Sequence, residues 1–553
     1  MLERGHTLRF YSPSLWREVA GHGATLFRGA AGGFGLGHSS SAKLAGLGTR
    51  LSSLKPGDAA VALDMTRGKF SFSGATINAI PAQIFNVAAP NATWAASLQN
   101  LGWLQHFVAS DQELHRIVAR SLIVAWGRQR KFWWPPTMQF RALMSLSLAA
   151  HFLVGKRPSS FEAPLGTMVE KLVRCIAALR PRAAPEQLLQ ALSLQYASLA
   201  FRGSPALRDQ ANAMFCAIIN EVILPDGGHV SRSPLALLES LMDIIPVKDA
   251  MIASHEVVPQ PLTAAIERMV PMLRMLSHGD HALSHFQGGG ATHPDWINAI
   301  LAHDKVHGRP LLSAPHSGYC RLAHGSGLVI LDVGIPRECN SPLAFEFSDG
   351  TQRLVSNCGM PASASPAWQT AAADMAAHNT LEVAGFSQDV VNSPQGKVTS
   401  SPLGSLAYCH NQISGRSGKI NHERTIFLSQ NGRDLRGEDR IIKISPEKLL
   451  ARNLDFTIRF HLHPSVKISA VRNAARVGLV LPNKTVWQFS ARGGDVTLED
   501  SVFLGHEHGP KKTRQIVVRG SSDSLEPVKW AFRRLEKASS GANPAEDTLR
   551  LPF

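Results

Sequence analysis

Hydrophobic and polar residues follow two different periods along this chain. Between about residues 92 and 275, apolar residues recur every three or four positions, in segments of roughly 13 to 18 residues. Short breaks containing Pro, Gly or Ser separate these segments, which include MVEKLVRCIAALR and PEQLLQALSLQYASLAF. The pattern predicts successive antiparallel helices of similar length that stack into a bundle or toroid.

From about residue 316 the period becomes two. Short segments such as GLVILDV, TLEVAG and LDFTIRFHLH alternate apolar and polar residues, and NG, DG, GG and SP turns separate them. This pattern is typical of an antiparallel sandwich. Because the helices come first and the strands follow, we predict an α+β multidomain protein in which an α/α toroid precedes a β-sandwich.

The length of the chain supports more than one domain. A single core stops growing near about 250 to 300 residues, and this chain has 553. Three consecutive glycines in HALSHFQGGGATHPDW favour a linker at that point. The expected division is a partly irregular extension at 1–90, a toroid at 91–280, a linker at 281–315 and a sandwich at 316–553.

The chain is strongly basic. It has 57 Lys and Arg against 42 Asp and Glu, a formal net charge of +15. Such a surface attracts nucleic acid, anionic membranes and acidic polysaccharides alike. The basic residues are scattered, with no run of five or more, and the sequence carries no recognised nucleic-acid-binding motif. We therefore expect no specific nucleic-acid partner, although a polyanion binder driven by charge alone remains a third alternative.

Cysteine spacing and the N-terminal segment bear on the cellular compartment. The six cysteines form no CxxC pair, which favours buried free thiols over a disulfide framework or a zinc knuckle. The first thirty residues contain no uninterrupted apolar stretch typical of a signal peptide. The sequence also has no apolar run long enough to span a membrane. On these features we predict a cytoplasmic protein without a membrane span.

Six ordered motifs resemble one family. They are ILPDGGHVSRSP, APHSGYCRLAHGSGLVILDVG, LAFEFSDGTQRLVSNCG, WQTAAADMAAHNTLEV, GEDRI and RFHLHPSV. Together they resemble bacterial heparinase II/III-like proteins over most of the chain. The resemblance implies an α/α toroid joined to an antiparallel β-sandwich, and a polysaccharide lyase acting on uronate-containing glycans in a cleft between them. It would also suggest a periplasmic or cell-envelope location.

A lyase of this kind needs three chemical functions. It must neutralise the uronate carboxylate, remove the C5 proton and protonate the departing O4. As catalytic candidates we name His378, His229 and Tyr408. As substrate-binding candidates we name Arg232, Asn379, Trp133 and Trp134, because arginine binds carboxylates or sulfates and aromatic rings stack on sugars.

Each candidate also has a structural interpretation. The loop that holds His229 and Arg232 can be a plain turn between two helices, and Tyr408 can be a half-buried strand residue. The two tryptophans can anchor a helix in the toroid. His461 and His463 alternate along one strand, as do His422 and Arg424, so each pair can either bind a metal or anion or stabilise the sheet.

The resemblance makes His378 similar to a zinc ligand, but its expected partners are missing. The positions of the other ligands carry Glu338, Cys339, Asn340, Ser341 and Asn357. Zinc needs at least three protein ligands, so we expect no metal and no cofactor. A soft site that adds Cys339 and Cys358 to His378 is an open alternative.

The tyrosine that relatives place close to Ser233-Pro234 is also absent, since Leu235, Ala236 and Leu237 follow. A catalytically impaired glycan-binding descendant of the lyase family is therefore the alternative to an active lyase.

Overall fold

The computed structural model describes residues 44–535, except 45, 130–133, 156–159, 204, 304–307, 362–365, 387–388, 391–394, 416–417, 446–452, 473–475, 507–508 and 523–525. The chain forms two compact units. Unit 1 comprises Met1–Val222 and Asp243–Thr263, and unit 2 comprises Ile223–Met242 and Ala264–Phe553.

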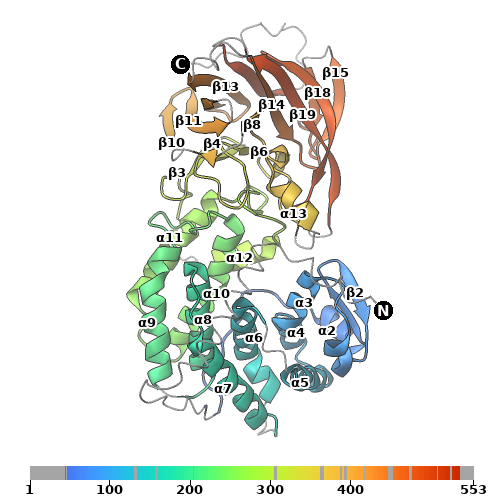
Figure 1. The fold of residues 1–553 in the computed structure, drawn as a ribbon, viewed down its shortest axis with the longest axis vertical. Helices are drawn as coiled ribbons and strands as arrows, with labels where there is room; N and C mark the ends of the chain where they lie inside the picture. Colours follow the sequence, from blue (N-terminus) through green and yellow to red (C-terminus); the bar gives the residue numbers. More distant parts are fainter. Residues whose placement is uncertain are drawn as a thin grey trace, which may run out of the picture. The chain divides into compact units, whose positions relative to one another are not determined.

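Unit 1 is mainly helical, as Figure 1 shows in blue and green. Its elements in chain order are α2 (Ala59–Thr66), β1 (Lys69–Phe72), β2 (Ala75–Asn78), the 3-10 helix η1 (Pro81–Asn86), α3 (Ala92–Gln99), α4 (Leu104–Ser110), α5 (Glu113–Gly127), α6 (Pro136–Val154), α7 (Glu162–Ala178), α8 (Ala184–Ala200) and α9 (Pro205–Val222). Helices α10 (Pro234–Ala253) and α11 (Gln260–Met275) each contain residues of both units.

Helix α8 lies at the centre of unit 1. It packs against α6 and α9, and every residue from Gln190 to Ala200 is buried, including the polar Gln190, Ser193, Gln195 and Ser198. Its Tyr196 hydroxyl donates a 2.9 Å hydrogen bond to the carbonyl of Asp243, which satisfies a phenol that is otherwise enclosed by apolar residues. The sequence prediction of stacked helices is confirmed. Among the described helices, none combines the length and apolar character needed to cross a bilayer.

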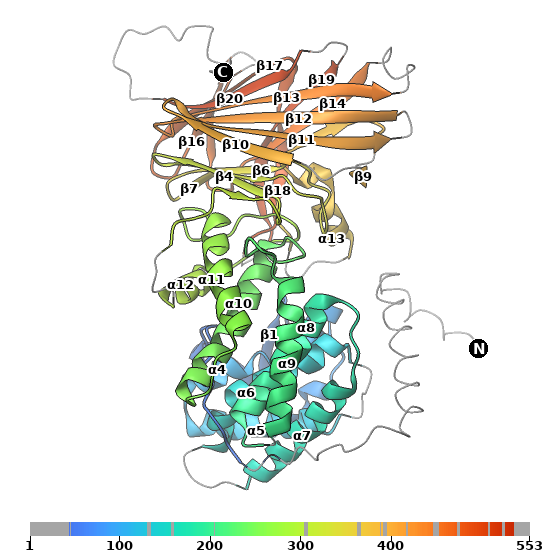
Figure 2. The same cartoon turned by 90° about the vertical axis from the view of Figure 1, so that its left-hand side faces the viewer.

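Unit 2 contains three antiparallel sheets among its described residues. One sheet has the order β3-β4-β5-β6-β7, a second has β18-β19-β14-β8, and the third has β10-β11-β12-β13-β20-β17-β16-β15 with β9 paired to β11. Figure 2 shows the long strands β11, β12 and β13 side by side. These sheets confirm the predicted antiparallel sandwich.

The strands of unit 2 are β3 (Ser313–Ala314), β4 (Tyr319–His324), β5 (Gly327–Asp332), β6 (Phe345–Asp349), β7 (Gln352–Val355), β8 (Leu381–Val383), β9 (Asp389–Val390), β10 (Gln395–Ser401), β11 (Gly404–Gly415), β12 (Gly418–Ser429), β13 (Asp434–Ser445), β14 (Leu454–His461), β15 (Lys467–Arg472), β16 (Arg476–Val480), β17 (Val486–Arg492), β18 (Asp495–Phe503), β19 (Lys511–Ser522) and β20 (Val528–Leu535). Its further helices are α12 (Pro294–Ala302), α13 (Pro366–Ala373) and the 3-10 helix η2 (Met375–Ala377).

One hydrophobic core joins the three sheets. It includes residues of β4–β8, β11–β14, β16, β17, β19 and β20. At its centre Phe345 of β6 stacks on Trp530 of β20, with ring centroids 5.2 Å apart, and Phe460 of β14 meets the same tryptophan edge-on at 5.0 Å. These aromatic contacts link strands that are far apart in the sequence, so they hold the sandwich together.

The region expected to be a linker, 281–315, is part of the folded unit instead. It contains helix α12, and Phe286 and Gln287 have no exposed surface. The Gln287 side chain donates to Asp332 (2.7 Å) and accepts from the backbone of Arg337 (2.8 Å). These contacts with residues distant in the sequence hold the segment in a defined conformation. The local composition of the segment gives no sign of them.

Candidate functional site

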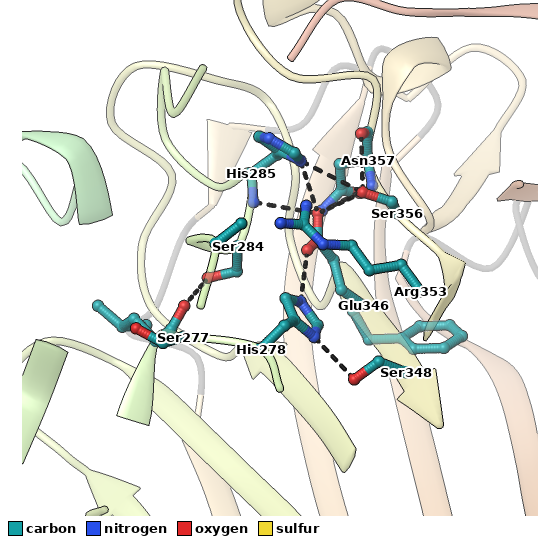
Figure 3. Close-up of polar contacts among 12 residues, drawn as sticks. Ser277, His278, Ser284, His285, Glu346, Ser348, Arg353, Ser356 and Asn357 are labelled. Atoms are coloured by element: carbon teal, nitrogen blue, oxygen red, sulfur yellow. Dashed lines mark hydrogen bonds and ion pairs between the residues drawn. The ribbon is translucent and has the colours of Figure 1, made fainter. Parts of the chain in front are cut away.

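A buried polar cluster of unit 2 surrounds Glu346 on β6 (Figure 3). His278 Nε2 lies 2.9 Å from one carboxylate oxygen of Glu346. The backbone N–H groups of His285 and Asn357 donate to the other oxygen at 3.0 and 2.9 Å. Glu346 has no exposed surface, and the two histidines are each 4% exposed. The carboxylate is therefore held by protein donors alone.

Hydrogen bonds decide the charge of this carboxyl group. Burial alone would raise the pKa of Glu346, but the hydrogen bonds of His278 and His285 oppose this effect, and that pKa lies well below its ordinary value. Burial lowers the pKa of His278, and Glu346 opposes this only in part. The pair is thus an ionised carboxylate beside a neutral imidazole at neutral pH.

Histidine beside glutamate is a suitable pair for general acid-base chemistry. However, a base must come within hydrogen-bond reach of the proton that it removes, and every side chain of this pair is enclosed. The second ring nitrogen of His278 is also engaged, 3.0 Å from Ser348 Oγ. The geometry gives the cluster a structural role.

A second network connects this cluster to the HNT motif. The Asn357 side chain accepts from the backbone N–H of Asn379 (2.8 Å) and donates to Glu346 (3.3 Å). The Asn379 side chain in turn donates to the carbonyl of Phe345 (3.0 Å) and accepts from the backbone of His461 (2.6 Å). Asn379 has no exposed surface, so its amide joins three chain segments of the sandwich.

His378 lies beside this network at 2% exposure. Neither of its ring nitrogens has a hydrogen-bond partner of ordinary geometry in the described part of the chain. Burial lowers the pKa of His378 to about 4, although the backbone of Ala372 and the charge of Glu346 oppose the shift. The imidazole is therefore neutral and enclosed. The nearby His461, which contacts Ser501 (2.7 Å) and the carbonyl of Ala376 (2.9 Å), also has its pKa lowered, to about 3.

The residues around His378 do not fit the zinc ion that the resemblance implies. The side-chain amide of Asn357 is already hydrogen-bonded to the backbone of Asn379 and to Glu346. Cys339 Sγ accepts a hydrogen bond from the backbone N–H of Gly288 at 3.2 Å. Burial raises the pKa of Cys339 to about 11 and that of Cys358 to about 12, so both thiols are protonated and poor ligands. The described residues contain no group of three or more His, Cys, Asp or Glu arranged to hold a metal ion.

Arg232 is a buried structural clamp. Its guanidinium forms an ion pair with Asp332 and donates to the carbonyls of Ser317 (2.7 Å), Gly318 (3.2 Å) and Ile335. It also lies over the ring of Tyr319, 5.2 Å from the centroid. Arg232 adopts a positive φ of 63°, an uncommon conformation that these contacts maintain. All three guanidinium nitrogens of Arg232 therefore donate hydrogen bonds to other residues of this chain.

The other two catalytic candidates have different surroundings. His229 is 6% exposed, its Nδ1 lies 2.7 Å from Ser231 Oγ, and burial lowers its pKa to about 4. Tyr408 is 38% exposed on β11, where its neighbours Ala407 and Cys409 enter the core. Tyr408 therefore lies on the outer face of the nine-stranded sheet and His378 inside the unit. The structure does not bring these side chains to one accessible surface.

The remaining sequence candidates are mostly structural. Trp133 lies outside the described residues, and the half-buried Trp134 packs on Trp126 with centroids 5.1 Å apart. His422 and Arg424 do not lie on a solvated face: both are fully buried and bond Asp439 at 2.7 Å. His463 instead lies 2.7 Å from Ser465 Oγ.

The cysteines agree with the predicted free thiols in part. All six lie in the described part of the chain and are unpaired. Cys320, Cys339, Cys358 and Cys409 are buried, Cys216 is partly buried, and Cys175 is exposed.

Comparisons with known proteins agree with this fold. The model of the heparinase II/III-like C-terminal domain matches residues 306–531. A protein of Caulobacter vibrioides named FtsZ-localized protein C is 30% identical over 531 residues, covering 89% of this chain and 91% of that protein. The chain belongs to the heparinase II/III-like family.

Solved heparinases share the architecture of this family member. A crystal structure of heparinase III superposes with a TM-score of 0.67 at 12% identity, covering 96% of this chain and 92% of that chain. The heparan sulfate lyase HepC from Pedobacter heparinus gives 0.58 at 14% identity, covering 86% and 83%. At such identities the similarity establishes the fold, a toroid followed by a β-sandwich, and not the activity.

Sequence reasoning missed the most connected residues of this family member. The cluster in Figure 3 is built from Glu346, His278 and His285, and the ion pair of Arg232 is formed with Asp332. None of these four partners stood out in the sequence. Glu346 alternates with the core residues Phe345 and Phe347 in the strand FEFSD, in which all five residues are buried. A carboxylate between two core aromatic residues is a signal of a buried ionic network when both faces of the strand are covered, because a buried charge must be paired.

Acidification should destabilise the protein. The pKa values of His378 and His229 are lowered to about 4, and those of His461 and His463 to about 3. Between the unfolded pKa near 6.5 and these folded values, the unfolded chain binds more protons, so the free energy of unfolding falls as pH falls. We expect a loss of about 2 kcal/mol for each such histidine near pH 4.5. Urea unfolding at a series of pH values measures this.

His378→Leu provides the matched comparison. It removes a buried titrating ring without adding a polar group, so the decline in unfolding free energy from neutral pH to acid should become shallower. An unchanged slope would show that His378 does not remain neutral in the folded protein.

Proposed function

We propose that this heparinase-like protein acts by binding, without β-elimination, and that it localises with FtsZ. The observation that carries the proposal is the 30% identity to FtsZ-localized protein C, which extends over 91% of that protein. Similarity over nearly the whole length includes residues of both units.

The chemistry of the site supports a binding role. The residues at the family's motif positions are used to stabilise the protein: Arg232 pairs with Asp332, Asn379 joins three segments, and His378 is enclosed. An elimination reaction needs a base and a cation that can reach the uronate. His378 and Arg232, the candidates for these two roles, are both buried.

Co-sedimentation with polymerised FtsZ tests the localisation. The full chain should enter the pellet only when FtsZ polymers are present, and a fluorescent fusion should coincide with labelled FtsZ in the cell. If the chain remains in the supernatant at every FtsZ concentration and the fusion stays dispersed, this proposal is wrong.

A second candidate is a polysaccharide lyase acting on acidic, uronate-containing glycans. The family membership and the heparinase III fold favour it. Incubation with heparan sulfate and other uronate polymers, followed through the ultraviolet absorbance of the unsaturated product, tests it. We expect no increase above the protein-free control. An increase that His378→Ala abolishes would establish elimination and overturn the binding-only role.

A further inference from the structure

Helix α5 of unit 1 presents apolar side chains to the solvent. Its buried residues lie on one side of the helix, and they are His115, Ala119, Leu122, Ile123 and Trp126. Because successive residues of a helix are turned by about 100°, the opposite side carries Glu113, Leu114, Ile117, Ser121, Val124 and Arg128. We call these six residues the α5 face. Leu114 and Ile117 are 59% and 54% exposed.

The composition of the α5 face is unusual for a helix side that meets water. Such a side is normally polar, but here Leu114, Ile117 and Val124 interrupt it. Together with Ser121 and Arg128, these residues recur at alternating intervals of three and four positions. This spacing is typical of the seam along which two helices pair. The α5 face therefore has the pattern of a helix whose partner is another helix.

The C-terminal half of the α5 face borders a pocket of about 490 Å³. Phe85 of η1, Val124 and Ala125 of α5, and Phe161 before α7 contribute apolar side chains to its lining, and Arg128 lines it as well. The same helix thus carries an apolar projection near its N-terminal end and an apolar pocket near its C-terminal end.

The two ends of α5 also differ in charge. The carboxylates of Asp111 and Glu113 both pair with one guanidinium, that of Arg116, so one negative charge is left over at the N-terminal end. At the pocket, Arg120 donates to two carbonyls of the last turn of α6, at 2.7 and 2.9 Å. Arg128 forms no ion pair within the described part of the chain and supplies a positive charge there.

A two-fold axis through Ser121 brings each of these features onto its complement. With a second α5 antiparallel across this axis, Ile117 of each copy faces Ala125 of the other, and Glu113 approaches Arg128. Ile117 and Ala125 are about 12 Å apart along the helix at a rise of 1.5 Å per residue, so each projection is level with the other copy's pocket. The small side chain of Ser121 lets the helices approach closely at the axis.

We propose that the α5 face joins two copies of this chain in an antiparallel, two-fold symmetric dimer. Such a contact uses the same surface on both copies, so the projection, the pocket and both charges must all lie on that surface. A single helix carries all of them here. A parallel pairing would instead place Arg128 against Arg128 and carboxylates against carboxylates. The dimer goes beyond the proposed function, since it needs neither FtsZ nor a glycan.

The charges and the shape of the α5 face favour a second copy over a lipid surface. An anionic membrane would repel the carboxylates of Asp111 and Glu113, whose side chains are 71% and 65% exposed. A helix lying on a membrane also buries a convex face, and it would leave the pocket beside α5 unfilled.

The size of the contact predicts a weak dimer. Helix α5 has 15 residues and is therefore about 22 Å long. Two such helices bury less than the roughly 800 Å² per partner of a standard interface. We expect a dissociation constant in the micromolar range.

Sedimentation equilibrium of the full chain between about 1 and 100 μM measures the association. Ile117→Asp should weaken it about tenfold or more, because it places a carboxylate against the apolar pocket of the other copy. The matched control is Ile252→Asp, at an isoleucine of α10 that is 55% exposed. It should change the association by less than about twofold. Thermal unfolding midpoints show whether both variants remain folded.

Charge reversal tests the antiparallel arrangement. Glu113→Arg and Arg128→Glu should each weaken self-association about tenfold, because each variant puts like charges at both ends of the α5 face. An equimolar mixture of the two variants should associate more tightly than either variant alone, since one face is then positive and the other negative. A change in the stability of the monomer cannot produce this recovery.

Four results would overturn the proposal. A wild-type chain that stays monomeric over the whole range would exclude the dimer. Equal losses for Ile117→Asp and Ile252→Asp would place the contact elsewhere, and no recovery in the mixture would exclude the antiparallel arrangement. Binding of the monomer to anionic phospholipid vesicles, abolished by Ile117→Asp, would assign the α5 face to lipid. All of these measurements omit FtsZ, so their outcome is independent of the proposed function.

Discussion

Arg232→Ala should destabilise the protein by about 3 to 5 kcal/mol, the cost of leaving one partner of a buried ion pair without the other. Asp332 has no exposed surface and would lose its main counter-ion. The carbonyls of Ser317 and Gly318 would each lose the hydrogen bond from the guanidinium as well. Urea unfolding followed by tryptophan fluorescence measures the change.

Two further variants separate the possible roles of Arg232. Arg232→Lys keeps a positive charge but lacks the planar fork, so most of the destabilisation should remain. Arg519→Ala, which breaks an exposed ion pair with Glu499, should change the stability by less than about 1 kcal/mol. If Arg232→Ala unfolds like the wild type but loses glycan affinity, Arg232 binds ligand and the structural interpretation is wrong.

Glu346→Ala should have an effect of similar size, about 3 kcal/mol or more. The substitution removes the acceptor for His278 and for the backbone N–H groups of His285 and Asn357, and all of these donors are buried. Glu346→Gln keeps the volume and one acceptor oxygen, so it should cost less. Unfolding free energies at neutral pH compare the two variants.

An exposed glutamate provides the control for this second prediction. Glu382 pairs with Arg459, and its side chain is 40% exposed. Because water replaces such a contact, Glu382→Ala should change the stability by less than about 1 kcal/mol. Equal losses for Glu346→Ala and Glu382→Ala would mean that the cluster in Figure 3 contributes no more than a surface ion pair.

The sequence predicted the fold class because periodicity is a local property. Apolar spacing of three and four gave α6, α8 and α9, and alternation gave β12, in which Ile420, Ile426 and Leu428 face the core. The same alternation places His422 and Arg424 at inward positions of β12. It does not predict that both side chains form hydrogen bonds with Asp439 on β13. Pairing with Asp439 provides a partner for the Arg424 guanidinium and for Nε2 of His422.

The linker at 281–315 illustrates the limit of composition. Three glycines weaken any backbone preference, so the sequence favoured an unstructured connection. In the structure Gly290 packs so closely on Met360 that an added Cβ would lie 2.3 Å from its carbonyl oxygen. Glycine here permits close packing, and only the contacting segment, distant in sequence, distinguishes this role from flexibility.

For the candidate site, the sequence by itself determined the residue types, the motif order and hence the family, and it predicted that a family-type zinc site is absent. Only the tertiary structure decided what His378, Arg232 and Asn379 do. Their burial and their partners come from segments tens to hundreds of residues away. Whether a polar side chain is available to a ligand depends on the groups that pack around it, and one-dimensional patterns record the residue but not those groups.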